Sequence, residues 1–154
     1  MVQYAYYPCP LGYLKIGWED DIILSIRCTD KPDSCDVSSS VSDAAAAQLT
    51  EYFDGKRTHF TFPIDVRGTA FQQTVWDALR RIPYGKVATY KDIAIAIGNP
   101  GAARAVGMAC NRNPVLIAIP CHRVLGSNRK LTGYAGGLDR KRQLLQLEHT
   151  NSPD

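Results

Sequence analysis

The adjacent residues Cys121 and His122 are the combination in this sequence best suited to nucleophilic chemistry. A cysteine thiolate is a strong nucleophile, and a neighbouring imidazole can take the thiol proton to form it. Adjacent residues of a regular strand point to opposite faces, so the pair needs either a turn or a water molecule between the two side chains. Pro120 favours a turn at this point. The alternative is that Cys121 is a small buried residue, as most cysteines are.

Two further features lie downstream of this pair. Thr132–Gly137 is rich in glycine and can form a mobile lid, a phosphate cradle or a turn. It matches neither the dinucleotide-binding pattern nor the P-loop pattern. Glu148, at the end of the last helical segment, can orient His122 or lie solvated at a helix end.

Five cysteines occur without a Cys-x-x-Cys pair. We therefore expect reduced cysteines and an intracellular, cytoplasmic protein without a signal peptide. No metal and no cofactor are expected, because the remaining candidate ligands match no zinc spacing. Those ligands are Cys9, Cys28, Cys35 and His59.

The composition is that of a globular protein of 154 residues, with 45% hydrophobic and 21% charged residues. This excludes disordered and collagen-like chains. The longest apolar runs hold five residues each, whereas a membrane span needs about 20. The charge is uneven, with a net −4 over residues 1–64 and +7 over residues 65–154. That asymmetry indicates either a nucleic-acid face or a solvated basic surface on the second half.

Helices and strands must position these residues, and the sequence pattern predicts an α/β (α+β) fold for them. In the first part, alternating branched and aromatic residues followed by a helical pattern predict a small sheet and helix lobe. Its predicted strands are 3–7, 11–18, 22–27 and His59–Pro63, with a loop over 29–42 and a helix over Ser42–Phe53.

The second part is predicted to be mainly helical. Thr69 and Thr89 each begin a capping box, with Gln72 and Asp92 three residues later. The first box predicts a helix running to Ile82, and the second a short helix that ends before Gly98. Further elements are a helix over Pro100–Cys110 capped by Asn99, a buried strand over Val115–Ile119 and a helix over Leu138–Leu147.

The two central helices, joined by a short turn, fit either a helix-turn-helix or an ordinary helical hairpin. Small residues dominate the second of them, and Arg104 is its one long charged residue. Such a helix can bring its backbone close to a partner, although small residues also suit a tightly packed core.

Several segments resemble the O6-alkylguanine-DNA alkyltransferase family, in order and at compatible spacing over about residues 66–148. They are Arg67–Gln72, Ile82–Gly85, Ala103–Gly107, Asn113-Pro114, Ile119–Val124 and Thr132–Leu138. The resemblance implies a structural, ribonuclease H-like lobe over residues 1–65. Residues 66–154 would form a helix-turn-helix domain for DNA binding and alkyl transfer.

The resemblance also implies the activity. The protein would bind duplex DNA in the minor groove as a monomer, with cooperative binding left open. It would flip out O6-alkylguanine, or O4-alkylthymine, and move the alkyl group once onto Cys121. His122 would act through water as the base, oriented by Glu148, with Asn113 supporting the active-site turn. Tyr90 would donate a proton to the leaving base.

The remaining implied roles concern DNA and the base pocket. Arg104 would fill the gap left by the flipped base, on a helix made thin by Ala103, Ala105 and Gly107. The pocket residues would be Val124, Tyr134, Ala135 and Lys141.

Two other readings stay open. Alkyltransferase-like proteins bind alkylated DNA but lack the acceptor cysteine, which is present here as Cys121. A cysteine hydrolase would need a base remote in sequence from its cysteine and an oxyanion hole, and the sequence indicates neither.

Overall fold

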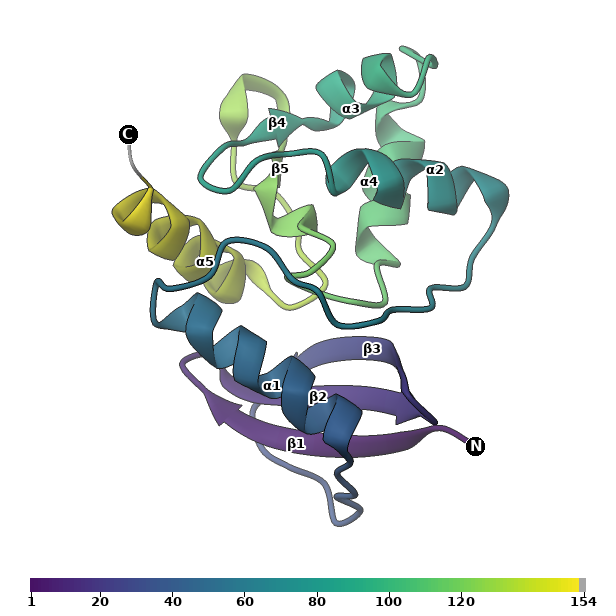
Figure 1. Ribbon diagram of the computed structural model, residues 1–154. Helices are drawn as coiled ribbons and strands as arrows, with labels where there is room; N and C mark the ends of the chain where they lie inside the picture. Colours follow the sequence, from purple (N-terminus) through teal and green to yellow (C-terminus); the bar gives the residue numbers. More distant parts are fainter. Residues whose placement is uncertain (153–154) are drawn as a thin grey trace. The chain divides into compact units, whose positions relative to one another are not determined.

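Three antiparallel strands and one helix form the first of two units in the chain, whose computed structural model describes residues 1–152 (Figure 1). The strands pair in the order β1-β2-β3, close to the predicted ranges. Alternate residues such as Leu14 and Ile16 are buried, as expected for a sheet with one covered face. The bounds are β1 Gln3–Cys9, β2 Gly12–Glu19 and β3 Ile22–Thr29.

Helix α1, Ser40–Phe53, lies across this sheet (Figure 1). It begins two residues before the predicted start, because Ser39 and Ser42 form a capping box at the end of the serine-rich segment. The helix stops before Gly55, whose φ of 77° is the left-handed conformation that ends many helices.

Two predicted strands were wrong. His59–Pro63 is irregular, and only the next residue, Ile64, forms a single bridge with Ile23. Val115–Ile119 is mostly buried, as predicted, but contains isolated bridge residues rather than a strand, and one bridge joins Val115 to Ile26. The chain then turns at Ile117, whose φ is 74°. Pro114–Leu116 consequently belong to the first unit, together with Met1–Val66.

The second unit consists of Arg67–Asn113 and the residues from Ile117 onward. Both predicted capping boxes are present, at the starts of α2, Ala70–Leu79, and α3, Tyr90–Ala96. Helix α2 ends before Ile82, which is buried in the following turn. Helix α5, Leu138–Asn151, extends four residues beyond the predicted end, so Glu148 lies inside it.

Helix α4, Ala103–Asn111, begins three residues later than predicted. Asn99 does not cap it; the Asn99 carbonyl instead accepts the Ala102 amide at 3.0 Å. Pro100 therefore occupies a turn, for which its fixed φ is as well suited as for a first helical position. The connection between α3 and α4 is longer than expected, and Arg104 lies in the first turn of α4.

The core of the second unit forms where α2 and α4 pack together. Trp76 is buried and donates from Nε1 to the Ala109 carbonyl at 2.9 Å.

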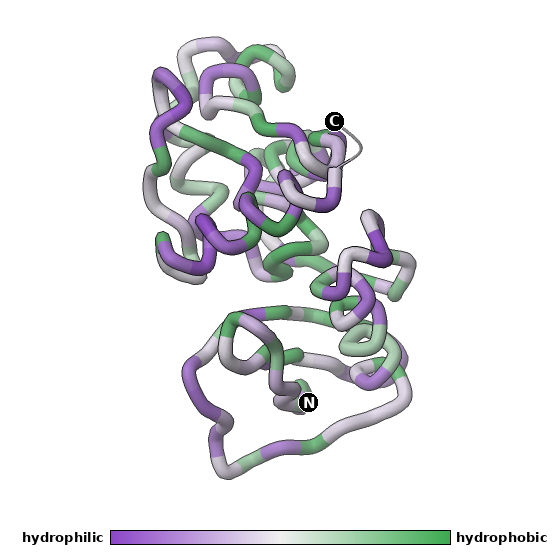
Figure 2. The backbone as a smooth tube through the Cα atoms, turned by 90° about the vertical axis from the view of Figure 1, so that its left-hand side faces the viewer, coloured by the Kyte–Doolittle hydropathy of each residue, from purple (hydrophilic) through white to green (hydrophobic). Residues whose placement is uncertain are grey.

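Hydrophobic and hydrophilic residues are interleaved along the chain (Figure 2). Within residues 1–152, no helix is long and apolar enough to span a membrane. The mixed α/β class is confirmed.

Candidate active site

A short strand pair brings the beginning of α3 next to the Cys121 turn. Strands β4, Ala88–Thr89, and β5, Val124–Leu125, run parallel and pair residue by residue. Thr89 also caps α3, so Tyr90 follows β4 directly, while Cys121 lies three residues before β5. Two segments more than thirty residues apart thereby meet at one site.

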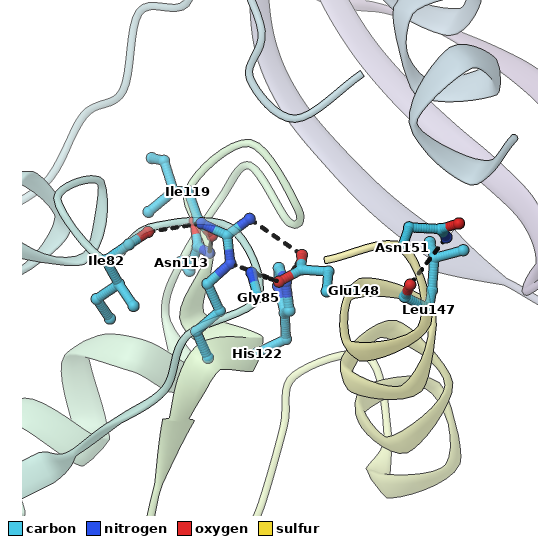
Figure 3. A network of polar contacts seen from close by, with 9 residues as sticks. Ile82, Gly85, Asn113, Ile119, His122, Leu147, Glu148 and Asn151 are labelled. Carbon is cyan, nitrogen blue, oxygen red and sulfur yellow. Dashed lines mark hydrogen bonds and ion pairs between the residues drawn. The ribbon is translucent and has the colours of Figure 1, made fainter. Parts of the chain in front are cut away.

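Cys121 begins a single 3₁₀ turn, η1, Cys121–Arg123. This turn replaces the regular strand in which Cys121 and His122 would point to opposite faces. Asn113 holds it by donating from Nδ2 to the Ile119 carbonyl at 2.7 Å and to the Cys121 Sγ at 3.1 Å. Figure 3 shows Asn113 beside Ile119. One amide group thus fixes both the backbone and the thiol.

The Cys121 thiol is buried, with 3% of the residue exposed. Burial raises its pKa to about 11, although the hydrogen bond from Asn113 and the charge of Lys141 act in the opposite direction. At neutral pH the resting group is therefore the thiol, and a nearby base is needed to form the thiolate.

His122 and Glu148 form a buried pair beside this thiol. The His122 Nε2 lies 2.6 Å from the Glu148 Oε2, and both residues are almost fully buried (Figure 3). Burial lowers the pKa of His122, so the imidazole is neutral at pH 7. Because Glu148 is ionised and can only accept, His122 donates from Nε2 and keeps a lone pair on Nδ1.

The Nδ1 lone pair of His122 can accept a proton. The His122 Nδ1 is buried and makes no hydrogen bond within residues 1–152. A neutral imidazole with one nitrogen tied to a carboxylate and the other unoccupied is the arrangement expected of a general base.

Arg123 is a member of this network that sequence reasoning missed. It donates to Glu148 from Nε at 2.8 Å and from Nη2 at 3.0 Å, and from Nη1 to the Ile82 carbonyl at 2.7 Å. The Gly85 amide adds a donor to Glu148 at 3.3 Å. Burial alone would raise the pKa of Glu148, but His122 and Arg123 outweigh it and hold that pKa well below its usual range.

We predict that Glu148→Gln lowers the free energy of unfolding by about 3–5 kcal/mol, because it leaves the buried Arg123 guanidinium without a counter-charge. Urea unfolding of the variant and the parent protein measures this difference. Asp139→Asn is the matched control, since Asp139 pairs with Arg142 on the same helix but is 90% exposed. Its effect should stay below about 1 kcal/mol. Equal losses in the two variants would show that burial of the Glu148 network is not the source of stability.

A cavity of about 680 Å³ lies between the beginnings of α3 and α4 and the loops on either side of Leu131. Four of the predicted residues line it: Tyr90, Ala103, Arg104 and Gly107. Burial raises the pKa of Tyr90, so its phenol keeps its proton at neutral pH. The other lining residues are Thr89, Lys91, Asn111, Gly126, Ser127, Asn128, Thr132 and Gly133.

The remaining predicted residues lie outside this lining. Val124, Tyr134 and Lys141 are buried in the same unit, whereas Ala105 and Ala135 are exposed. The Lys141 ammonium donates to the carbonyls of Thr132 at 3.0 Å and Gly133 at 3.2 Å. The glycine-rich segment is thus tied to α5 by a buried cation.

Exposed cationic side chains lie at or near the cavity: Lys91 and Arg104 line it, and Arg129 and Lys130 lie in the loop between the lining residues Asn128 and Thr132. Within residues 1–152, four of these cations make no side-chain hydrogen bond and no ion pair. These four are Lys91, Arg104, Arg129 and Lys130. Exposed cations of this kind can donate hydrogen bonds to the phosphates of a nucleic acid.

Of the cysteines in the first unit, Cys35 is exposed, and Cys9 and Cys28 are half-buried. Among the residues that the structure describes, no group of three or more His, Cys, Asp or Glu side chains is arranged to hold a metal ion.

Comparison with known proteins assigns both units to one family. Residues 2–66 match the ribonuclease-like domain of 6-O-methylguanine DNA methyltransferase, and residues 70–150 match its DNA binding domain. The ribonuclease-like assignment agrees with the expected character of the first lobe.

Relatives and solved structures agree with this assignment. A methylated-DNA–protein-cysteine methyltransferase of Mycolicibacterium paratuberculosis is 45% identical, over 99% of this chain and 96% of its own length. The crystal structure of the Mycobacterium tuberculosis O6-methylguanine methyltransferase has a TM-score of 0.90 at 43% identity, covering 99% of this chain and 96% of its own. The same protein in complex with DNA also has a TM-score of 0.90 at 43% identity, covering 98% and 95%. The chain therefore belongs to the 6-O-methylguanine DNA methyltransferase family and to the enzyme class of methylated-DNA–protein-cysteine methyltransferases.

Proposed function

We propose that this protein repairs O6-alkylguanine, and O4-alkylthymine, in duplex DNA by transferring the alkyl group to Cys121, once per molecule. The observation that carries the proposal is the Cys121 thiol, held by Asn113 at 3.1 Å beside a neutral His122 whose Nδ1 is unoccupied. The presence of Cys121 favours transfer over DNA binding alone.

The chemistry follows from these groups. His122 takes the thiol proton through a water molecule, and Glu148 holds the ring in position and stabilises the imidazolium that forms. The thiolate attacks the alkyl carbon on O6; the sulfur–carbon bond forms as the carbon–oxygen bond breaks. The electron pair passes to the leaving guanine, which takes a proton from Tyr90. In the net reaction the thiol hydrogen moves to guanine, and the alkyl group stays on sulfur as a thioether.

Access to the base requires that it leave the helical stack, at a cost of a few kcal/mol. Arg104, in the first turn of α4, offsets this cost by filling the vacated space. Ala103, Ala105 and Gly107 keep α4 thin enough for the minor groove. Lys91, Arg129 and Lys130 contact phosphates around the cavity. Val124, Tyr134, Ala135 and Lys141 shape the site that holds the flipped base.

We assign these roles to residues 66–154, with residues 1–65 as a structural lobe, and infer that the protein acts as a monomer. A reaction that consumes a free thiolate suits a reducing compartment, so the proposed location is the cytoplasm.

A stoichiometry experiment tests the proposal. Increasing amounts of protein are added to a duplex containing one O6-methylguanine, and the loss of the methyl group from DNA is measured. We expect one methyl group lost per protein molecule and no further turnover. Preferential binding without loss would identify a non-catalytic binder, and continued turnover would contradict transfer to the protein.

A further inference from the structure

Thr132 places a hydroxyl opposite the Tyr90 phenol. The Tyr90 Oη and the Thr132 Oγ1 lie 3.1 Å apart, and either oxygen can be the donor. Tyr90 begins α3, Thr132 lies in the loop before α5, and both line the cavity. The bond therefore connects two walls of the site.

Thr132 makes two further contacts, one through its backbone and one through its side chain. Its carbonyl accepts a hydrogen bond from the buried Lys141 ammonium at 3.0 Å. Its γ-methyl packs against Gly126, where a Cβ would lie only 2.8 Å from the Thr132 Cγ2. Although Thr132 is exposed, these contacts and the bond to Tyr90 limit the positions that its hydroxyl can take.

The direction of this hydrogen bond decides what Tyr90 can do. A phenol has one proton, which can point to Thr132 or into the cavity, but not both. Within residues 1–152, the Tyr90 Oη is the only hydrogen-bond partner of the Thr132 Oγ1. When Thr132 donates, the Tyr90 proton is free to point into the cavity.

We propose that Thr132 is a positioning residue for alkyl transfer, because its hydroxyl donates to Tyr90 and so directs the phenolic proton toward the leaving base. This inference rests on the proton-donor role proposed above for Tyr90. As the carbon–oxygen bond breaks, the base takes the Tyr90 proton and Thr132 stabilises the phenolate that remains. The proton that His122 took from Cys121 then returns to Tyr90 through solvent, which balances the step.

The acidity of the Tyr90 phenol agrees with this role. Burial raises the pKa of Tyr90, which would make the phenol a poorer acid in the site. The hydrogen bond to Thr132 opposes that effect. Removing the Thr132 hydroxyl should therefore slow the chemical step and leave DNA binding unchanged.

Thr132→Val tests the proposal, because valine keeps the methyl contact with Gly126 and removes the hydroxyl. Single-turnover rates on methylated duplex are measured over a range of DNA concentrations. We expect the rate at saturating DNA to fall roughly tenfold, as for the loss of one hydrogen bond. The DNA concentration giving half the maximal rate should not change. Thr132→Ser should restore the rate to within about twofold.

Double-variant experiments separate this role from a structural one. In a Tyr90→Phe background, Thr132→Val should cause no further loss, because both changes remove the same hydrogen bond. The pair Thr132→Ala and Thr132→Ser repeats the comparison without the methyl, should valine disturb the fold.

Two results would overturn the inference: a full rate for Thr132→Val, or the same loss with and without the Tyr90 hydroxyl. Failure of the parent protein to demethylate DNA would instead overturn the proposed function.

Discussion

Cys121→Ser should abolish alkyl transfer and leave affinity for methylated duplex within about twofold. A hydroxyl is a far weaker nucleophile than a thiolate at neutral pH. Cys121 is buried and does not line the cavity with the basic side chains, so its oxygen analogue should not disturb DNA contacts. Methyl transfer is measured by loss of the methyl group from duplex DNA, and affinity by fluorescence anisotropy on the same duplex.

Cys110→Ala is the matched control. Cys110 is a second buried thiol in the same unit, and burial raises its pKa to about 12, compared with about 11 for Cys121. The Cys121 thiol also accepts a hydrogen bond from Asn113, which favours its thiolate. We expect Cys110→Ala to retain transfer. Methyl incorporation into Cys121→Ser would show that another residue is the acceptor.

Arg104→Ala should slow transfer from duplex DNA by about a hundredfold or more, while reaction with the free base O6-benzylguanine stays near the parental rate. Flipping costs a few kcal/mol, and every 1.36 kcal/mol left uncompensated slows the reaction tenfold. The free base needs no extrusion from a helix. Arg104 is exposed and makes no side-chain hydrogen bond or ion pair within residues 1–152, so its loss should not unfold the site.

Arg112→Ala controls for the loss of one positive charge from the same region. Arg112 follows the last residue of α4 and does not line the cavity beside Tyr90. We expect it to retain near-parental rates on both substrates. The two rates are measured side by side for each variant. An equal fall of both rates in Arg104→Ala would indicate a packing role, and no fall would indicate a surface charge.

Local signals in the sequence were sufficient to predict the starts of two helices. The capping boxes at Thr69 and Thr89 need only side chains three residues apart, so tertiary contacts do not alter them. The start of α4 was misplaced because Pro100 fits a turn as well as a first helical position. In the structure the Asn99 carbonyl accepts the Ala102 amide in such a turn, and the helix begins at Ala103.

Long-range contacts explain what sequence reasoning could not supply. The apolar run over Val115–Ile119 predicted burial correctly, but the left-handed backbone at Ile117 prevents a strand. The contact between Arg123 and Glu148 joins residues 25 positions apart, so no local pattern indicates it. The place of Arg123 directly after the Cys121-His122 pair was the one available signal. The bond between Thr132 and Tyr90 spans 42 positions and gave none.

The most direct test of the central claim is a peptide mass map of the protein after reaction with a duplex containing O6-methylguanine. Trypsin cleavage after Arg112 and Arg123 releases Asn113–Arg123, which contains Cys121 as its only cysteine; Cys110 lies in the preceding peptide. The account predicts that Asn113–Arg123 gains the mass of one CH2 unit, because a methyl group replaces the thiol hydrogen, in an amount equal to the methyl lost from DNA. Demethylated DNA with an unchanged Asn113–Arg123 peptide, or a methyl group on any other peptide, would contradict it.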